Sequence, residues 1–272
     1  MPLKFFPSSV ATVSQRPPWP RGAQRRTAFL PTSRPPSPHP FSSPPFSSKR
    51  RRSPPPWLLC GPAPVSGNYT ENSTYQANIN LLAATLPRNA SAATFLYATD
   101  SVGSVPDMVY ALALCRADAD ASACEGCVAT AFRGAQQGCP LFKDVMVFYD
   151  LCQLRFSNRD FFLDDDYIVN TYILQGPQVA ATASTQQPDA FDAAFGLLVN
   201  ATADYAAENS SRRFGTGEEG FDDKLSIPKI YALAQCTPDR TTDICRTCLN
   251  TIVSQLLPSY FSGRNGGGVF GV

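Results

Sequence analysis

The sequence predicts an α+β protein of two tandem, disulfide-stapled domains, in each of which two helices pack on an antiparallel sheet. Three observations lead to this prediction: a repeated cysteine spacing, an alternation of helix-type and strand-type apolar patterns, and a sharp change in composition after residue 56. A chain of 272 residues is long enough for one large domain or two small ones. The cysteine repeat favours two.

The cysteines form two triplets with the same spacing. The first is Cys115-x8-Cys124-x2-Cys127 and the second is Cys236-x8-Cys245-x2-Cys248. The preceding residues also match, with Val-Tyr-Ala-Leu-Ala-Leu before the first triplet and Ile-Tyr-Ala-Leu-Ala-Gln before the second, at an offset of 121 residues. Such self-similarity indicates a tandem duplication of a domain of about 105 residues plus a linker.

The apolar pattern of the first copy predicts the order helix, strands, helix, strands. Residues 70–86 place Tyr75, Ile79, Leu82 and Leu86 three or four positions apart, which is typical of an amphipathic helix, and Pro87 is expected to end it. Residues 121–137 are rich in alanine and carry two cysteines on one turn, which predicts a second helix. Short apolar segments predict strands at 94–98, 108–116, 145–149 and 151–156.

The second copy repeats this order, which allows the chain to be divided. Its expected elements are a helix at 190–207, a strand at 227–235 and a helix at 240–256. The first domain is assigned to residues 57–162, the second to residues 187–272, and a linker to residues 163–186. The linker contains Asp164-Asp165-Asp166, which we interpret as a solvated turn, with a cation site as the alternative.

Residues 1–56 differ from the rest of the chain in charge and composition. They contain 10 of the 23 Lys and Arg residues, none of the 22 Asp and Glu residues, and 15 of the 25 prolines. The net charge of +1 therefore divides into +10 for this segment and −9 for the remainder. A basic Pro/Ser/Arg-rich segment without apolar periodicity is expected to be disordered. It lacks the apolar run of a secretory signal peptide, and no part of the chain has the length of apolar sequence that a membrane span needs.

A run of basic residues at 49–52 raises the question of a nucleic-acid or nuclear-localisation patch. We interpret it as a solvated basic run in a disordered segment, so no nucleic-acid partner is expected.

The single histidine and the cysteine pattern limit the chemistry. His39 lies within residues 1–56, which excludes Ser-His-Asp sites, Cys-His sites and imidazole-ligated zinc from the rest of the chain. An all-cysteine zinc site usually takes two Cys-x2-Cys pairs, whereas each copy here has one. We therefore expect structural disulfides and no metal or cofactor, with metal binding or redox exchange as the alternative.

Five Asn-x-Ser/Thr sequons accompany the cysteines, at Asn68, Asn72, Asn89, Asn200 and Asn209. All five lie outside residues 1–56. Together with the cysteines they favour an oxidising secretory compartment, and we expect these five asparagines to be glycosylation sites.

The cysteine pattern resembles that of a known plant domain. The spacing Cys115-x8-Cys124-x2-Cys127-x11-Cys139-x12-Cys152, with Cys60 upstream, is similar to the ginkbilobin-homologous domain, also called the stress-antifungal or salt-stress-response domain. The segments Asn-Tyr-Thr-x-Asn-Ser-Thr-Tyr-Gln-x-Asn from residue 68 and Cys-Gln-Leu-Arg-Phe-Ser-Asn from residue 152 match as well. Tandem copies of this domain form the ectodomains of cysteine-rich receptor-like kinases, plasmodesmata-located proteins and cysteine-rich repeat secretory proteins. The resemblance covers residues 57–272.

The resemblance implies a fold and a disulfide pairing. Each domain would have two helices on a five-stranded antiparallel sheet. The family's connectivity implies the bridges Cys60–Cys139, Cys115–Cys124 and Cys127–Cys152, and in the second copy Cys236–Cys245.

The second copy departs from the family pattern. The counterpart of Cys60 would fall near residue 181, where there is no cysteine, and the counterpart of Cys139 is Tyr260. The counterpart of Cys152 would fall near position 274, beyond Val272, so Cys248 is expected to be unpaired. The second domain is accordingly expected to be C-terminally truncated, with its sheet incomplete and its last two strands largely absent. An exposed Cys248 thiol for intermolecular pairing is the alternative.

No catalytic constellation is evident, so we expect that the protein is not an enzyme. The sequence has no phosphate-binding loop and no kinase signature. In ginkbilobin, mannose is held by an Asn, an Arg and a Glu whose positions here are Gly61, Met146 and Ser157, and Gly268 stands where the second copy would carry the Arg. The ligand-binding residues are therefore unknown.

Two functions remain for a chain of this kind. The first is a non-enzymatic extracellular interaction module in plant defence or stress signalling, either a receptor-type ectodomain or a secreted protein. Its partners would be other extracellular proteins or cell-wall glycans, and the resemblance places it in the apoplast. The alternative is a secreted antifungal, mannose-binding, lectin-like effector.

Overall fold

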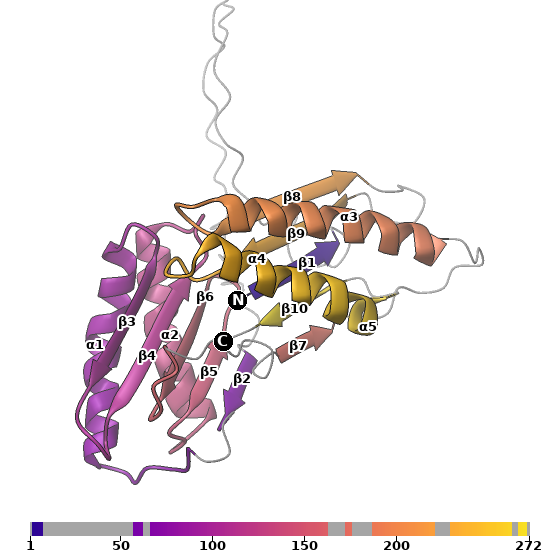
Figure 1. The fold of residues 1–272 in the computed structure, drawn as a ribbon. Helices are drawn as coiled ribbons and strands as arrows, with labels where there is room; N and C mark the ends of the chain where they lie inside the picture. The colour runs from indigo at the N-terminus through magenta and orange to yellow at the C-terminus, as the bar shows by residue number, and fades with distance from the viewer. Residues whose placement is uncertain are drawn as a thin grey trace, which may run out of the picture.

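Two five-stranded antiparallel sheets organise the chain, and helices cover one face of each (Figure 1). The computed structural model describes residues 2–7, 57–61, 66–162, 172–175, 187–220, 229–262 and 266–270. The predicted α+β fold of two tandem domains is confirmed.

The first domain has the strand order β2-β5-β6-β4-β3. Its core lies between the sheet and two helices and contains Tyr75, Ile79 and Leu82 from the first helix and Val128 and Phe132 from the second. The elements are β2 (Trp57–Cys60), α1 (Thr74–Ala92), β3 (Tyr97–Val102), β4 (Val109–Cys115), α2 (Ala121–Gly138), β5 (Val145–Phe148) and β6 (Cys152–Ser157).

Helix α1 begins and ends later than its apolar pattern predicts. Ser73 is its N-cap, with Oγ accepting a hydrogen bond from the backbone N–H of Gln76 at 3.4 Å. The prediction that Pro87 ends the helix is wrong, because the helix continues to Ala92 with Pro87 inside it. Pro87 and Ala90 are both buried, so the apolar face extends beyond the proline, and its packing offsets the backbone hydrogen bond that proline cannot make.

The strand predicted at 94–98 is displaced in the structure to β3. Leu96 has a φ of 52°, which places a turn at this point and delays the strand to Tyr97. The Leu96 carbonyl accepts a hydrogen bond from the backbone N–H of Cys115 at 2.9 Å, so the turn is joined to the end of β4. The other predicted elements of the first domain lie within two residues of their predicted bounds.

The second domain has the strand order β7-β10-β1-β9-β8. Its core includes Val199, Ala203, Leu249, Ile252 and Val269. The elements are β1 (Pro2–Pro7), β7 (Tyr172–Gln175), α3 (Gln187–Glu208), β8 (Phe214–Gly220), β9 (Lys229–Gln235), α4 (Thr242–Thr251), the π-helical segment η3 (Ile252–Leu256), α5 (Leu257–Phe261) and β10 (Gly267–Phe270). The single helix predicted at 240–256 is thus a succession of three helical segments that ends at Phe261.

Two strands of this second sheet come from segments that were predicted to lie outside both domains. β1 belongs to residues 1–56, so the predicted disorder does not hold at Pro2–Pro7, while residues 8–56 lie outside the described part of the chain. β7 belongs to the predicted linker 163–186, whose remaining residues, including Asp164-Asp165-Asp166, are outside it too.

The prediction of an incomplete second sheet is therefore wrong. β1 and β7 give this sheet five strands. β10 pairs with β7 on one side and with β1 on the other. Backbone pairing between distant segments completes the sheet, and such pairing leaves no local signal in the sequence.

Half-cystines join the helices to the sheets. In the first domain the structure joins Cys60 to Cys139, Cys115 to Cys124 and Cys127 to Cys152, and in the second it joins Cys236 to Cys245. The Cys115–Cys124 and Cys236–Cys245 bridges have the same sequence separation of nine, and each joins the end of an interior strand, β4 or β9, to the start of the following helix.

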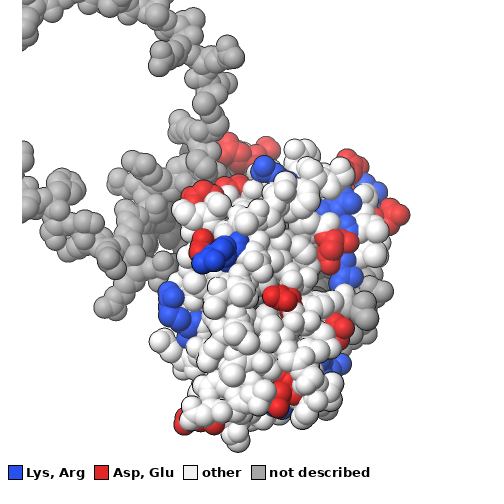
Figure 2. Space-filling model, turned by 90° about the vertical axis from the view of Figure 1, so that its left-hand side faces the viewer, with Lys and Arg blue, Asp and Glu red and all other residues white. Residues whose placement is uncertain are grey.

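Charged side chains of both signs are interspersed on the face of the molecule drawn in Figure 2, with wide uncharged areas between them. This is the side on which α1 and β3 lie in Figure 1. A surface with both signs of charge interspersed does not create an electrostatic potential of a single sign.

Removing the long bridge should cost more stability than removing a short one in the same domain. Cys60→Ala with Cys139→Ala opens a loop of sequence separation 79 and is expected to lower the unfolding free energy by about 4.5 kcal/mol. Cys115→Ala with Cys124→Ala opens a separation of 9 and should cost about 2.7 kcal/mol on the same loop-entropy relation. Urea unfolding of the two double variants measures both values, and equal losses would contradict this account.

Candidate functional site at the domain interface

The two domains meet through the sheet faces that their helices leave uncovered. Side chains alternate along β5, so that Val145 and Val147 belong to the helix-covered core while Met146 and Phe148 point to the opposite face. Met146 and Phe148 pack there against Phe270 of β10, in the second domain. The rings of Phe148 and Phe270 have their centroids 4.6 Å apart. The interface is thus apolar where these two strands meet.

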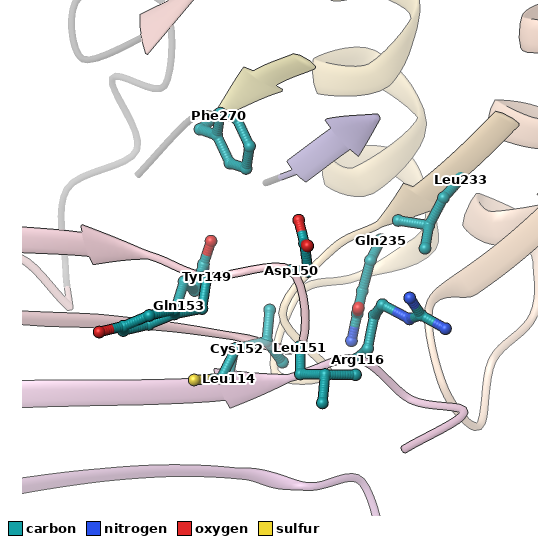
Figure 3. Close-up of a pocket in the computed structure, with 10 residues that line it drawn as sticks. All are labelled: Leu114, Arg116, Tyr149, Asp150, Leu151, Cys152, Gln153, Leu233, Gln235 and Phe270. Atoms are coloured by element: carbon teal, nitrogen blue, oxygen red, sulfur yellow. The ribbon is translucent and has the colours of Figure 1, made fainter. Parts of the chain in front are cut away.

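A hollow opens beside this contact and is lined from both domains (Figure 3). Its volume of about 290 Å³ includes space open to solvent, so it is not the volume of an enclosed cavity. The lining residues are Leu114, Arg116, Tyr149, Asp150, Leu151, Cys152, Gln153, Leu233, Gln235 and Phe270. The size of the hollow and its openness favour a contact surface over an enclosed ligand site.

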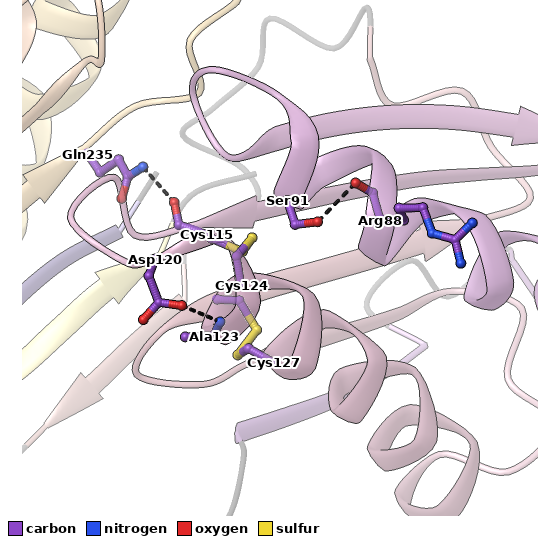
Figure 4. Close-up of a disulfide and its surroundings, with 9 residues drawn as sticks. Arg88, Ser91, Cys115, Asp120, Ala123, Cys124, Cys127 and Gln235 are labelled. Carbon is purple, nitrogen blue, oxygen red and sulfur yellow. Dashed lines mark hydrogen bonds between the residues drawn. A yellow bond between two sulfur atoms is a disulfide. The ribbon is translucent and has the colours of Figure 1, made fainter.

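One hydrogen bond in the interface comes from the position at which the two sequence repeats differ. The motif Tyr-Ala-Leu-Ala-x-Cys has Leu114 in the first copy and Gln235 in the second. Gln235 is 1% exposed, and its Nε2 donates to the carbonyl oxygen of Cys115 at 3.0 Å (Figure 4). A buried amide needs such a partner, and here the partner belongs to the other domain.

Two arginines of the second domain also donate to backbone carbonyls of the first. Arg212 Nη1 lies 3.1 Å from the carbonyl oxygen of Ala117, and Arg240 Nη2 lies 3.4 Å from that of Phe162. Hydrogen bonds from charged donors are stronger than neutral ones. Because the acceptors are backbone groups, these contacts depend on the position of the chain rather than on the identity of the first-domain side chains.

A fourth polar contact between the domains joins Tyr97 to Asp239. The Tyr97 hydroxyl donates to Oδ2 of Asp239 at 3.1 Å. Burial, and after it the negative charge of Asp239, raises the pKa of Tyr97, so the phenol keeps its proton at every physiological pH. The contact is therefore a stable hydrogen bond and not a titrating switch.

The three positions that correspond to the ginkbilobin mannose ligands do not form a polar site. Met146 is 1% exposed and Ser157 is fully buried. Gly61 has a φ of 62°, and its N–H donates to the carbonyl of Asp144 at 2.8 Å. Gly268, the second-copy counterpart, is buried in β10. None of these four residues offers a side-chain donor or acceptor to a sugar at the surface.

Next to these positions lies a buried ion pair that sequence reasoning missed. Arg155 Nε is 3.7 Å from Oδ1 of Asp144, and the Arg155 guanidinium lies 4.0 Å from the centroid of the Phe161 ring. Asp144 also accepts a hydrogen bond from Ser66 Oγ at 3.4 Å. Burial raises the pKa of Asp144, and the charge of Arg155 opposes the rise. The pair joins β6 to the loop before β5 and so has a positioning role; no motif or spacing in the sequence marks it.

The sequons differ in how their asparagines are placed. Asn68, Asn72, Asn89 and Asn200 are exposed. Asn209 is half-buried, with Nδ2 donating to the carbonyl of Phe214 at 3.2 Å and Oδ1 accepting the N–H of Arg212 at 3.3 Å. Its amide group thus stabilises the turn after α3, while Asn200 Nδ2 donates to the carbonyl of Gly196 at 2.8 Å within α3.

Cys248 is free and buried in the core of the second domain. Burial raises the pKa of its thiol, while the charges of the amino terminus and of Arg240 lower it. The alternative, that Cys248 is an exposed thiol available for intermolecular pairing, is wrong because the side chain is buried.

The residues that the structure describes contain neither a cluster suited to a metal ion nor a helix suited to a membrane. Within them, no group of three or more His, Cys, Asp or Glu side chains is placed to hold a metal ion. In that part of the chain no helix combines the length and the hydropathy needed to cross a membrane.

Comparison with known families gives a match over both domains. The family described as salt stress response/antifungal matches residues 59–159 and 178–267. The two matched segments follow the two sheets of the structure, although β1 and β7 lie outside them.

The relatives include both kinases and secreted proteins. The chain is 65% identical over 220 residues to cysteine-rich receptor-like protein kinase 6 of Oryza sativa subsp. japonica, which covers 80% of this chain but only 31% of that protein. It is 33% identical over 208 residues to cysteine-rich repeat secretory protein 38 of Arabidopsis thaliana, covering 76% of this chain and 77% of the relative. The chain thus spans less than a third of the kinase and most of the secretory protein.

Among solved structures, the tandem DUF26 ectodomain of the Arabidopsis thaliana cysteine-rich receptor-like protein PDLP8 has a similar fold. The TM-score is 0.58 at 18% sequence identity, and the match covers 79% of this chain and 97% of the other. At this identity the likeness concerns the fold alone.

Gln235→Leu should weaken the domain interface. The substitution removes the buried donor to the Cys115 carbonyl and leaves that oxygen without this partner, so we expect a loss of about 1–3 kcal/mol in unfolding free energy. The matched control is Gln136→Leu, which removes a hydrogen bond to Asn80 at the exposed surface of the first domain and should cost no more than about 0.5 kcal/mol. Thermal and urea unfolding compare the two, and equal losses would argue against the interface contact.

Proposed function

Because this chain belongs to the salt stress response/antifungal family, we propose that it is a non-enzymatic extracellular interaction module in plant defence or stress signalling. It would act as an ectodomain of the receptor-like kinase type or as a secreted cysteine-rich repeat protein. Both kinds of protein occur among its relatives, and the fold of this chain is similar to that of a solved tandem ectodomain.

The observation that carries the proposal is the polar contact between the domains. Gln235, Arg212 and Arg240 donate to three backbone carbonyls of the first domain, and Phe148 packs on Phe270 beside them. Contacts of this kind hold two small domains as one body with a continuous outer surface. A recognition protein needs such a surface, since binding energy is lost when the binding face must first be ordered.

The charge distribution supports proteins or cell-wall glycans as partners rather than nucleic acid. Residues 57–272 carry a net charge of −9, and the face drawn in Figure 2 mixes both signs over a largely uncharged surface. Binding to nucleic acid depends on a basic surface that neutralises phosphates. The lectin-like alternative has no support in the residues at Gly61, Met146 and Ser157.

The cysteines and sequons support placement in the apoplast. Four disulfides would persist only in an oxidising compartment. We propose that the exposed Asn68, Asn72, Asn89 and Asn200 carry glycans, whose hydrophilic chains would then restrict contact surfaces to the areas between them. Asn209 is also a sequon asparagine, but it is half-buried and its amide is hydrogen-bonded on both sides in the turn after α3.

Binding measurements on the secreted chain test this function. The full chain, expressed through the secretory pathway of plant cells, is applied to an array of plant receptor ectodomains and to an array of mannose-containing glycans. We expect saturable binding to at least one ectodomain, lost when the disulfides are reduced and alkylated, and no binding to mannosides. Mannoside binding without ectodomain binding would contradict the proposal and favour the lectin-like effector.

A further inference from the structure

The N-terminal strand β1 occupies in the second sheet the place that β6 occupies in the first. β6 lies between β5 and β4 and is antiparallel to both. β1 lies between β10 and β9 and is antiparallel to both as well. The remaining strands correspond in order, so the two sheets have the same arrangement. The middle strand of the first sheet is the last strand of its own domain, whereas the middle strand of the second sheet comes from the N-terminal segment (Figure 1).

The two strands differ in how they are held. β6 is joined covalently to helix α2 through Cys152 and Cys127. Cys248 is the counterpart of Cys127 in the sequence repeat, and it is free and buried. The sequence of β1, Pro-Leu-Lys-Phe-Phe-Pro, contains no cysteine. No disulfide therefore ties β1 to the second domain.

Backbone pairing connects β1 to its neighbours. Leu3 to Phe5 pair with Val269 to Gly267 on β10 and with Ala234 to Ala232 on β9. Both ends of the strand are prolines, which cannot donate to a ladder. Residues 8–56 separate β1 from β2, which belongs to the other sheet, so β1 is not continuous in sequence with the domain that it completes.

From this arrangement we propose that the space between β9 and β10 is a strand-binding site for an extended polypeptide segment, and that Pro2–Pro7 is its exchangeable occupant within the chain. Departure of β1 leaves two unpaired strand edges facing each other, and an incoming strand pairs with both at once. Main-chain hydrogen bonds would supply the affinity. Ala234 of β9, Val269 of β10 and Cys248 of α4 belong to the one buried core of the second domain, beside the space that such a strand would fill. The proposal does not depend on the proposed function.

Cys248 provides a reporter for the exchange, because it is the free cysteine and is buried in this core. In the full chain, Phe5→Pro places a proline opposite both Gly267 and Ala232 and should expel β1. We expect the rate of Cys248 modification by a thiol reagent to rise at least tenfold. Phe41→Pro, the same substitution in the segment between β1 and β2, is the matched control and should leave the rate unchanged.

A peptide added in trans separates strand exchange from unfolding. A synthetic peptide with the sequence of residues 2–7 should return the modification rate of the Phe5→Pro variant towards that of the native chain, whereas a scrambled peptide should not. A fluorescent form of the peptide should bind the Phe5→Pro variant at least tenfold more tightly than the native chain, whose own β1 competes for the site. An unchanged rate in Phe5→Pro, a rise that the peptide does not reverse, or equal binding to both chains would overturn the proposal.

Discussion

A disulfide between the end of an interior strand and the start of the following helix is the constraint on which the rest of the structure depends. Cys115–Cys124 joins β4 to α2, and Cys236–Cys245 repeats the arrangement between β9 and α4. Each helix is also capped at its start, by Asp120 in one domain and by Thr241 in the other. The bridge and the cap together set where the helix lies on its sheet. The carbonyl oxygen of Cys115 also accepts a hydrogen bond from Gln235 Nε2. The residue that links β4 to α2 in the first domain thus also contacts the second domain.

The sequence predicted what is encoded locally. The repeated cysteine spacing and the apolar periodicity of residues 121–137 led to the two domains and to helix α2, whose capping residue and buried face lie within the same short segment. β1 and β7 were not predicted, because pairing between Leu3 and Val269 leaves no pattern at either position. The prediction that Pro87 ends α1 was wrong for a related reason. Pro87 is buried within the helix, and this tertiary packing overrides the local preference of proline to end a helix.

The domain interface could be predicted only in part. The difference between Leu114 and Gln235 is visible when the two copies are aligned, yet its meaning depends on knowing that the Cys115 carbonyl of the other domain lies 3.0 Å away. Arg212 and Arg240 donate to backbone groups, and a backbone acceptor has no signature in the sequence. The same holds for the buried pair of Asp144 and Arg155, which are brought together by the pairing of β5 with β6.

Disulfide mapping of the oxidised, full-length chain tests the central claim most directly. Proteolysis without reduction, followed by mass spectrometry, should find Cys115 linked to Cys124 and Cys236 linked to Cys245, the two equivalent strand-to-helix bridges, with Cys248 as a free thiol. A bridge from Cys248 to Cys236 or Cys245, or a linkage of Cys115 to Cys127, would contradict the account. It would mean that the two domains do not share one strand-to-helix constraint.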